Sequence, residues 1–122
     1  MAKKILVVDD EPDITLMLRA RLEANGYEVD VAYDGHAALE MVKKNSFDLI
    51  ILDLMLPRID GYSVCRMLKF DNKYKKIPII IFTARTESAD KKLAEEVGAD
   101  AYVTKPYVPE ILLGKIRTLL NE

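Results

Sequence analysis

The 122-residue sequence is half hydrophobic and 31% charged, and its formal net charge is −2. This composition is typical of a soluble globular protein and argues against a disordered or nucleic-acid-coating chain. The length predicts a single domain over residues 1–122, the apolar runs are too short to cross a bilayer, and no signal-peptide pattern opens the chain. We therefore expect a cytoplasmic protein that binds neither nucleic acid directly nor a membrane. The single cysteine, Cys65, agrees with a reducing compartment.

Strand patterns and helix patterns alternate from the start of the chain. Lys4–Val8 is an apolar run, and Pro12 then suits the first position of a helix that stops at Asn25-Gly26. The buried face of that helix is expected to contain Ile14, Met17, Leu18 and Leu22. Residues 28–31 alternate polar and apolar side chains, which predicts a strand at a sheet edge. Asp34-Gly35 caps the next helix, whose apolar face is Ala38, Met41 and Val42.

The second half of the chain continues the alternation. Residues 49–52 are aliphatic throughout, which predicts a strand buried on both faces that ends at Asp53. A helix over residues 62–70 follows, with Val64, Met67 and Leu68 at helical spacing. Residues 79–82 form a second doubly apolar strand ending at Thr83, and a helix over 87–97 is stopped by Gly98. A short strand over 101–103 ends at Thr104-Lys105-Pro106, and Pro109 opens a last helix with a buried face of Leu112, Ile116, Leu119 and Leu120.

Five predicted strands that alternate with five helices favour a parallel sheet covered on both faces. The apolar strands that start at Ile5, Leu49 and Ile79 are expected at the centre, and the two weaker strands at the edges. The doubly wound order 2-1-3-4-5 satisfies that assignment. The sequence therefore predicts a flavodoxin-like α/β fold, a three-layer sandwich of five βα units.

Polar residues follow four of these strands directly. Asp9, Asp10, Asp53, Thr83 and Lys105 leave the carboxyl ends of parallel strands, so they are expected to converge at one edge of the sheet. Carboxylates brought close together repel and need a proton or a cation. Oxygen ligands with room for water fit Mg²⁺ or Mn²⁺. Lys105 adds a positive charge and Thr83 a hydroxyl donor, which are the groups that a transferring phosphoryl oxygen requires.

Each of these residues also has a simpler interpretation when it is considered alone. Asp9 and Asp10 suit the start of a helix, where acidic residues are favoured. Asp53 alone is a loop-start carboxylate, Thr83 a strand-end hydroxyl and Lys105 a solvated charge. Their joint placement at four strand ends favours a site that carries a phosphoryl group on a carboxylate.

Several fragments, in this order on the predicted elements, resemble the receiver domain of two-component response regulators. They are Val8-Asp9-Asp10-Glu11-Pro12, Leu52-Asp53-Leu54-Met55-Leu56-Pro57 with Asp60-Gly61, Phe82-Thr83-Ala84-Arg85, and the segment from Gly98 to Tyr107. The resemblance covers essentially the whole chain. It implies that Asp53 accepts a phosphoryl group from a sensor histidine kinase or a phosphotransfer protein. It also implies that Asp10, Asp53 and the backbone carbonyl of Met55 bind Mg²⁺ directly, with Asp9 acting through water.

The resemblance further implies a switch rather than an enzyme, because such a domain catalyses only its own phosphorylation and dephosphorylation. Lys105 would pair with the phosphoryl group, and the peptide bond from Lys105 to Pro106 would be cis. Thr83 and Tyr102 would move on phosphorylation and alter a partner face formed by the last two helices and the strand between them. That face is expected to bind a partner protein, which includes a second copy of the chain in a phosphorylation-dependent homodimer. The resemblance does not identify the output domain or downstream protein.

The motif Asp53-Leu54-Met55-Leu56-Pro57 is similar to the corresponding motif in receivers of the winged-helix transcription-factor subfamily. Ala101, Glu110 and Ile111 depart from the pattern of that subfamily, which removes support for its dimer salt bridges. Two other classes compete with the receiver interpretation. A haloacid-dehalogenase-like phosphatase uses the same residue types, but its Asp-x-Asp motif follows the first strand. A flavin module on this fold would have a phosphate-binding loop rich in hydroxyls and glycine at that point, where this chain is acidic.

Overall fold

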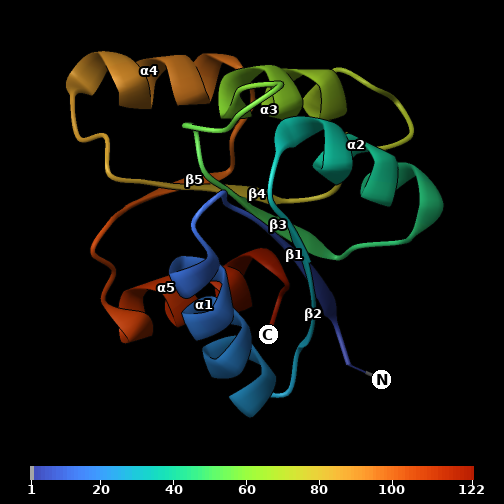
Figure 1. Ribbon diagram of the computed structural model, residues 1–122, viewed down its shortest axis with the longest axis vertical. Coiled ribbons are helices and arrows are strands. Elements are labelled where there is room, and N and C mark those ends of the chain that lie inside the picture. The colour runs from blue at the N-terminus through green and yellow to red at the C-terminus, as the bar shows by residue number, and fades with distance from the viewer. Residues whose placement is uncertain (1) are drawn as a thin grey trace.

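A computed structural model describes residues 2–122. Within that range five parallel strands form one sheet in the order β2-β1-β3-β4-β5, which confirms the predicted topology (Figure 1). The strands are β1 (Lys4–Val8), β2 (Glu28–Ala32), β3 (Leu49–Leu52), β4 (Ile79–Thr83) and β5 (Ala101–Thr104). The helices are α1 (Pro12–Ala24), α2 (Gly35–Lys44), α3 (Gly61–Lys69), α4 (Ser88–Glu96) and α5 (Pro109–Leu119). None of these helices is long and apolar enough to span a bilayer.

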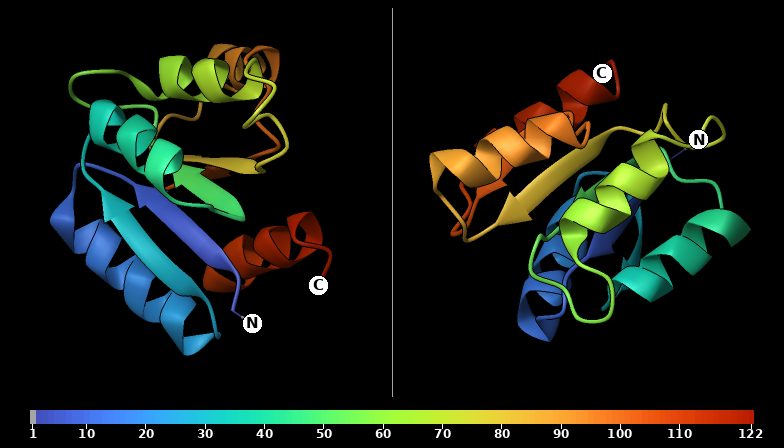
Figure 2. Two further views of the ribbon diagram at one scale, coloured as in Figure 1. Left: turned by 90° about the vertical axis from the view of Figure 1, so that its right-hand side faces the viewer. Right: turned by 90° about the horizontal axis from the view of Figure 1, so that it is seen from above.

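The helices cover both faces of the sheet. Helices α1 and α5 lie on one face, and α2, α3 and α4 lie on the other, as Figure 1 and the turned views of Figure 2 show. Alternate residues of β1 therefore enter different cores: Ile5 and Val7 pack on the α1 and α5 side, and Leu6 and Val8 on the opposite side. Every residue of β3 and β4 is buried. Burial on both faces explains why these central strands are unbroken apolar runs in the sequence.

Two methionines expected in the core are exposed instead. The exposed fraction is 48% for Met17 in α1 and 53% for Met67 in α3. Their places are taken by Thr15 and Cys65, which are buried. The Thr15 hydroxyl donates to the carbonyl of Pro12 at 2.9 Å, so its burial leaves no unpaired polar group. Leu18 and Leu22 of α1 and Val64 and Leu68 of α3 are buried as predicted. The prediction is therefore wrong at one position in each helix, because the apolar pattern favours a flexible methionine over a small side chain.

Cys65 packs in the core between α3 and the end of α4. Its thiol donates to the carbonyl of Val97 at 3.6 Å, and burial raises the pKa of Cys65 to about 12. Cys65 therefore packs as a small buried hydrophobic side chain.

The helix ends follow the predicted capping chemistry. The Asp34 carboxylate accepts a hydrogen bond from the Ala37 N–H at 2.7 Å at the start of α2. Gly26 and Gly98, which follow α1 and α4, have φ angles of 90° and 92°, a conformation that side chains with a Cβ disfavour. Helix α3 begins one residue earlier than predicted, at Gly61, and α4 is one residue shorter at each end.

Gly61 lies against the loop that leaves β3. A Cβ atom at this position would run into the backbone carbonyl of Asp53 and come within 2.6 Å of the Leu54 Cα. The Gly61 N–H donates to the Leu54 carbonyl at 3.0 Å, which holds the helix start in place. Gly114 in α5 differs, because a Cβ there would meet open space.

These two glycines predict opposite effects of alanine on stability. Gly61→Ala is expected to lower the free energy of unfolding by about 2 kcal/mol, because backbone atoms must shift to admit the methyl group. Gly114→Ala is expected to raise it by roughly 0.5–1 kcal/mol, because alanine loses less conformational entropy in a helix. Urea unfolding of the two variants beside the wild type measures both changes. An unchanged Gly61→Ala midpoint would contradict the close approach.

Candidate functional site

Backbone hydrogen bonds fix the residues that leave the strands at the carboxyl edge of the sheet. The N–H of Asp9 donates to the carbonyl of Ala32 at 3.1 Å, and the N–H of Asp53 donates to the carbonyl of Val8 at 2.9 Å. The N–H of Lys105 donates to the carbonyl of Thr83 at 2.8 Å. These residues thus extend the hydrogen-bonding pattern of the sheet by one position.

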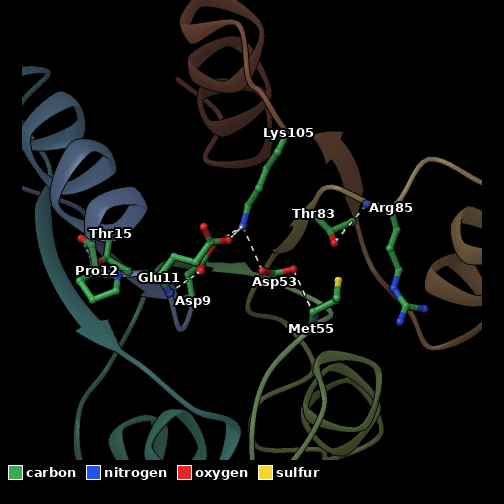
Figure 3. A network of polar contacts seen from close by, with 9 residues as sticks. All are labelled: Asp9, Glu11, Pro12, Thr15, Asp53, Met55, Thr83, Arg85 and Lys105. Carbon is green, nitrogen blue, oxygen red and sulfur yellow. Dashed lines mark hydrogen bonds and ion pairs between the residues drawn. The ribbon is translucent and has the colours of Figure 1, made fainter.

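The Lys105 ammonium connects the carboxylates of this edge (Figure 3). Its Nζ lies 2.7 Å from Asp9 Oδ2, 3.0 Å from Asp53 Oδ2 and 3.3 Å from Glu11 Oε1. The Lys105 side chain is 11% exposed, and the Asp9 and Asp53 side chains only 1% and 5%. Three strands, β1, β3 and β5, therefore lead to one buried cluster of opposite charges.

The second oxygen of each buried carboxylate accepts a backbone hydrogen bond. Asp9 Oδ1 accepts from the Glu11 N–H at 2.9 Å, and Asp53 Oδ1 accepts from the Met55 N–H at 3.2 Å. Within residues 2–122, no buried side-chain nitrogen or oxygen is left without a partner. The cluster is therefore preorganised: both carboxylates are held at both oxygens.

Burial and pairing act in opposite directions on the charges of this cluster. Burial raises the pKa of Asp9, and its hydrogen bonds with Lys105 and the Glu11 N–H only partly oppose that shift. Burial alone would lower the pKa of Lys105, but hydrogen bonds to Asp9 and Asp53 outweigh it and raise that pKa. Lys105 is thus firmly protonated, whereas Asp9 carries its negative charge at a cost.

The acidic residues form a set of oxygen ligands. Carboxylate oxygens of Asp9, Asp10, Glu11 and Asp53 lie within 4.8 Å of one another. Asp10 and Glu11 are exposed, whereas Asp9 and Asp53 are buried, so the set opens toward solvent on one side. Hard oxygen donors with an open side fit Mg²⁺ or Mn²⁺. Glu11 was not predicted to belong to this set, although its place directly after Asp10 was available as a signal.

The other predicted site residues lie around this cluster. Thr83 is fully buried at the end of β4, and its Oγ1 accepts from the Arg85 N–H at 3.4 Å. Met55 lies two residues beyond Asp53, and its side chain is exposed. Tyr102 is half-buried on β5, and its hydroxyl donates to the Arg85 carbonyl at 2.8 Å rather than to the acidic cluster. The peptide bond from Lys105 to Pro106 is cis, as predicted.

The sequence matches a known protein family over most of its length. The family model of the response regulator receiver domain matches residues 5–117. The chain belongs to this family. That membership decides against the dehalogenase-like and flavin-binding alternatives.

Relatives with assigned functions are similar over nearly the whole chain. The chain is 44% identical over 121 residues to the alkaline phosphatase synthesis transcriptional regulatory protein PhoP of Bacillus subtilis, covering 99% of this chain and 50% of that protein. It is 43% identical over 118 residues to the response regulator ArlR of Staphylococcus saprophyticus, covering 97% of this chain and 52% of that protein. The chain thus spans about half the length of these regulators.

Solved structures of receiver proteins have the same fold. A putative response regulator from Chloroflexus aurantiacus superposes with a TM-score of 0.95 at 34% identity, over all of both chains. The chemotaxis response regulator CheY4 of Vibrio cholerae superposes with a TM-score of 0.91 at 34% identity, over 98% of this chain and 99% of that one. The chain is therefore a response regulator receiver, a signalling switch from a family that is phosphorylated on aspartate.

The raised pKa of Asp9 predicts how stability depends on pH in metal-free buffer. Because this pKa lies above the ordinary value of 3.8, the folded state holds the Asp9 proton more tightly than the unfolded state, and ionisation of Asp9 reduces stability as pH rises through that range. Asp9→Asn removes this cost and is expected to unfold with a higher free energy than the wild type at pH 7.

Urea unfolding at several pH values, with a chelator present, measures this difference. The advantage of Asp9→Asn is expected to shrink as pH falls and to vanish below the ordinary pKa of 3.8, where Asp9 is protonated in both states. A variant that is less stable than wild type at pH 7 would contradict the assigned cost of ionising Asp9.

Proposed function

We propose that residues 1–122 form one receiver domain whose phosphoryl acceptor is Asp53. The observation that carries this proposal is the contact of Lys105 Nζ with both Asp53 Oδ2 and Asp9 Oδ2. A lysine held against a carboxylate at the end of a buried strand is already in place to pair with a phosphoryl group attached to that carboxylate. The donor is a sensor histidine kinase or a phosphotransfer protein.

In the proposed reaction an Asp53 oxygen forms a bond to phosphorus while the phosphorus–nitrogen bond of the donor phosphohistidine breaks. The electron pair of that bond leaves with the imidazole, and Asp53 becomes an acyl phosphate. Lys105 pairs with the charge that Asp53 then carries, and the Thr83 hydroxyl donates to a phosphoryl oxygen. Water later attacks phosphorus, which releases inorganic phosphate and restores the carboxylate. The domain therefore catalyses its own phosphorylation and dephosphorylation.

The acidic cluster is the proposed site of Mg²⁺, or of Mn²⁺ in its place. Asp10, Asp53 and the backbone carbonyl of Met55 would bind the ion directly, and Asp9 would act through water. When bound, the ion supplies the positive charge that lets an anionic donor approach several carboxylates. The oxygen ligands within 4.8 Å of one another support this assignment.

The proposed output of phosphorylation is a change in partner binding through α4, β5 and α5. Thr83 moves toward the phosphoryl group, Tyr102 moves inward behind it, and the two positions bias a bistable packing of this face. Large apolar side chains are exposed there, among them Leu93, Val108 and Ile111. The partner that this face binds is a second copy of the chain or a downstream protein. The cytoplasmic location of the protein stays a prediction.

Phosphorylation with a small donor tests Asp53. Incubation with acetyl phosphate and Mg²⁺ is expected to add one phosphoryl group to the wild-type protein, which intact mass spectrometry detects. Asp53→Asn is expected to abolish labelling. Asp48→Asn is the matched control, because Asp48 immediately precedes β3 and accepts a hydrogen bond from the Lys4 N–H at the opposite end of the strand from Asp53. Unchanged labelling of Asp53→Asn would overturn the assignment.

Thermal unfolding tests the metal site without phosphorylation. Mg²⁺ at about ten times its dissociation constant is expected to stabilise the wild type by roughly 1.4 kcal/mol, since it binds the folded state only. Asp10→Asn is expected to lose most of that gain. Asp13→Asn, which removes the same charge from the first turn of α1, should keep it. Equal stabilisation of Asp10→Asn and the wild type would contradict the role of Asp10.

A further inference from the structure

A second polar network lies beside the acidic cluster and ties the loop after β4 to its surroundings. The Tyr62 hydroxyl donates to Asp90 Oδ1 at 2.8 Å and also contacts the Asp90 carbonyl at 3.3 Å. The same Asp90 oxygen lies 3.2 Å from a terminal nitrogen of Arg85. The Tyr102 hydroxyl holds the Arg85 carbonyl at 2.8 Å. Arg85 is therefore fixed at both its backbone and its guanidinium.

Two residues of this network, Arg85 and Tyr62, lie close in sequence to residues that border the proposed phosphorylation site. Arg85 lies two residues after Thr83, and its N–H donates to Thr83 Oγ1. Tyr62 follows Gly61, where an added Cβ atom would run into the backbone of Asp53. Lys105 extends into the acidic cluster, whereas the Arg85 side chain leads away from Asp53 and Thr83 (Figure 3). Two cations thus share one edge of the sheet, and only Lys105 is directed into the cluster.

Asp90 and the acidic cluster are two negatively charged groups that can each pair with the Arg85 guanidinium. The acidic cluster contributes four carboxylates and contacts one lysine, so it attracts any mobile cation nearby. Arg85 has a long flexible side chain that is 46% exposed. Asp90 gives it a competing partner, and the hydrogen bond from Tyr62 holds the Asp90 carboxylate in the orientation that Arg85 needs. Tyr62 lowers the pKa of Asp90, so this partner stays charged.

We propose that Asp90 and Tyr62 are positioning residues that hold the Arg85 guanidinium out of the acidic cluster, so that its carboxylates stay available to Mg²⁺. The proposal rests on the proposed function of that cluster as a metal site. Without the two residues, Arg85 turns toward the carboxylates and competes with the ion for them. A guanidinium that pairs with these oxygens opposes Mg²⁺ by occupying ligands and by charge repulsion.

Mg²⁺ titration of five variants beside the wild type tests the proposal through two double-mutant cycles: the single variants Asp90→Asn, Tyr62→Phe and Arg85→Ala, and the first two each combined with Arg85→Ala. Asp90→Asn and Tyr62→Phe are each expected to raise the Mg²⁺ dissociation constant, by roughly three- to tenfold for Asp90→Asn and about twofold for Tyr62→Phe at low ionic strength. In an Arg85→Ala background neither substitution should change it appreciably. Tyr62→Phe is the more informative variant, since it leaves all charges in place.

Tyr27→Phe is the matched control. It removes a tyrosine-to-carboxylate hydrogen bond of 2.7 Å to Glu122, beside the start of β2 and away from the metal site, and should leave Mg²⁺ affinity unchanged. The proposal is overturned if Tyr62→Phe and Asp90→Asn weaken Mg²⁺ equally with and without Arg85, because the effect would then be structural or a plain loss of negative charge. It is also overturned if neither variant changes the affinity.

NMR of the Arg85 Nε–Hε group provides a readout that needs neither metal nor phosphorylation. In the metal-free wild type its signal should show the restricted rotation of a paired guanidinium, and Asp90→Asn should shift it and alter that rotation. An unchanged Arg85 signal would overturn the inference by itself. If the wild type fails to bind Mg²⁺, the proposed metal site is wrong, whereas the NMR result still decides whether Asp90 positions Arg85.

Discussion

The contact of one ammonium group with two buried carboxylates is the interaction on which this molecule depends. Lys105 Nζ lies 2.7 Å from Asp9 and 3.0 Å from Asp53, and these residues leave β5, β1 and β3. The contact therefore joins strands from the centre and one edge of the sheet. Buried ion pairs add little net stability compared with apolar residues of similar size. The ion pairs of Lys105 with Asp9 and Asp53 at the end of an otherwise apolar sheet are therefore better explained by a role in the function of the site than by a contribution to stability.

Much of this site could be predicted because its residues follow strands directly. The apolar runs of β1, β3 and β4 identify the central strands, and parallel strands bring Asp9, Asp53, Thr83 and Lys105 to the same edge. The backbone fixes their positions almost independently of side-chain detail. The cis peptide bond before Pro106 and membership of the receiver family were predicted from the resemblance of short motifs to that family. Hydrophobic periodicity indicates neither of them.

What the sequence could not supply depends on contacts between residues far apart. Tyr62 and Asp90 are separated by 28 positions, and nothing local indicates that a tyrosine on α3 will orient an aspartate on α4. The exposure of Met17 and Met67 was missed for a similar reason. A helical pattern defines a face to within a residue or two, and the packing of the neighbouring elements decides which side chain enters the core.

The burial of Cys65 has a practical consequence for experiments on this chain. It is the only cysteine in the sequence, its side chain is fully buried, and its pKa is raised to about 12. Because the thiolate is the reactive form, this thiol is protected from alkylating dyes and spin labels at neutral pH. A cysteine introduced on the exposed side of α4 or α5 would be the single reactive thiol. Fluorescent or paramagnetic probes can therefore follow that surface without removal of the native residue.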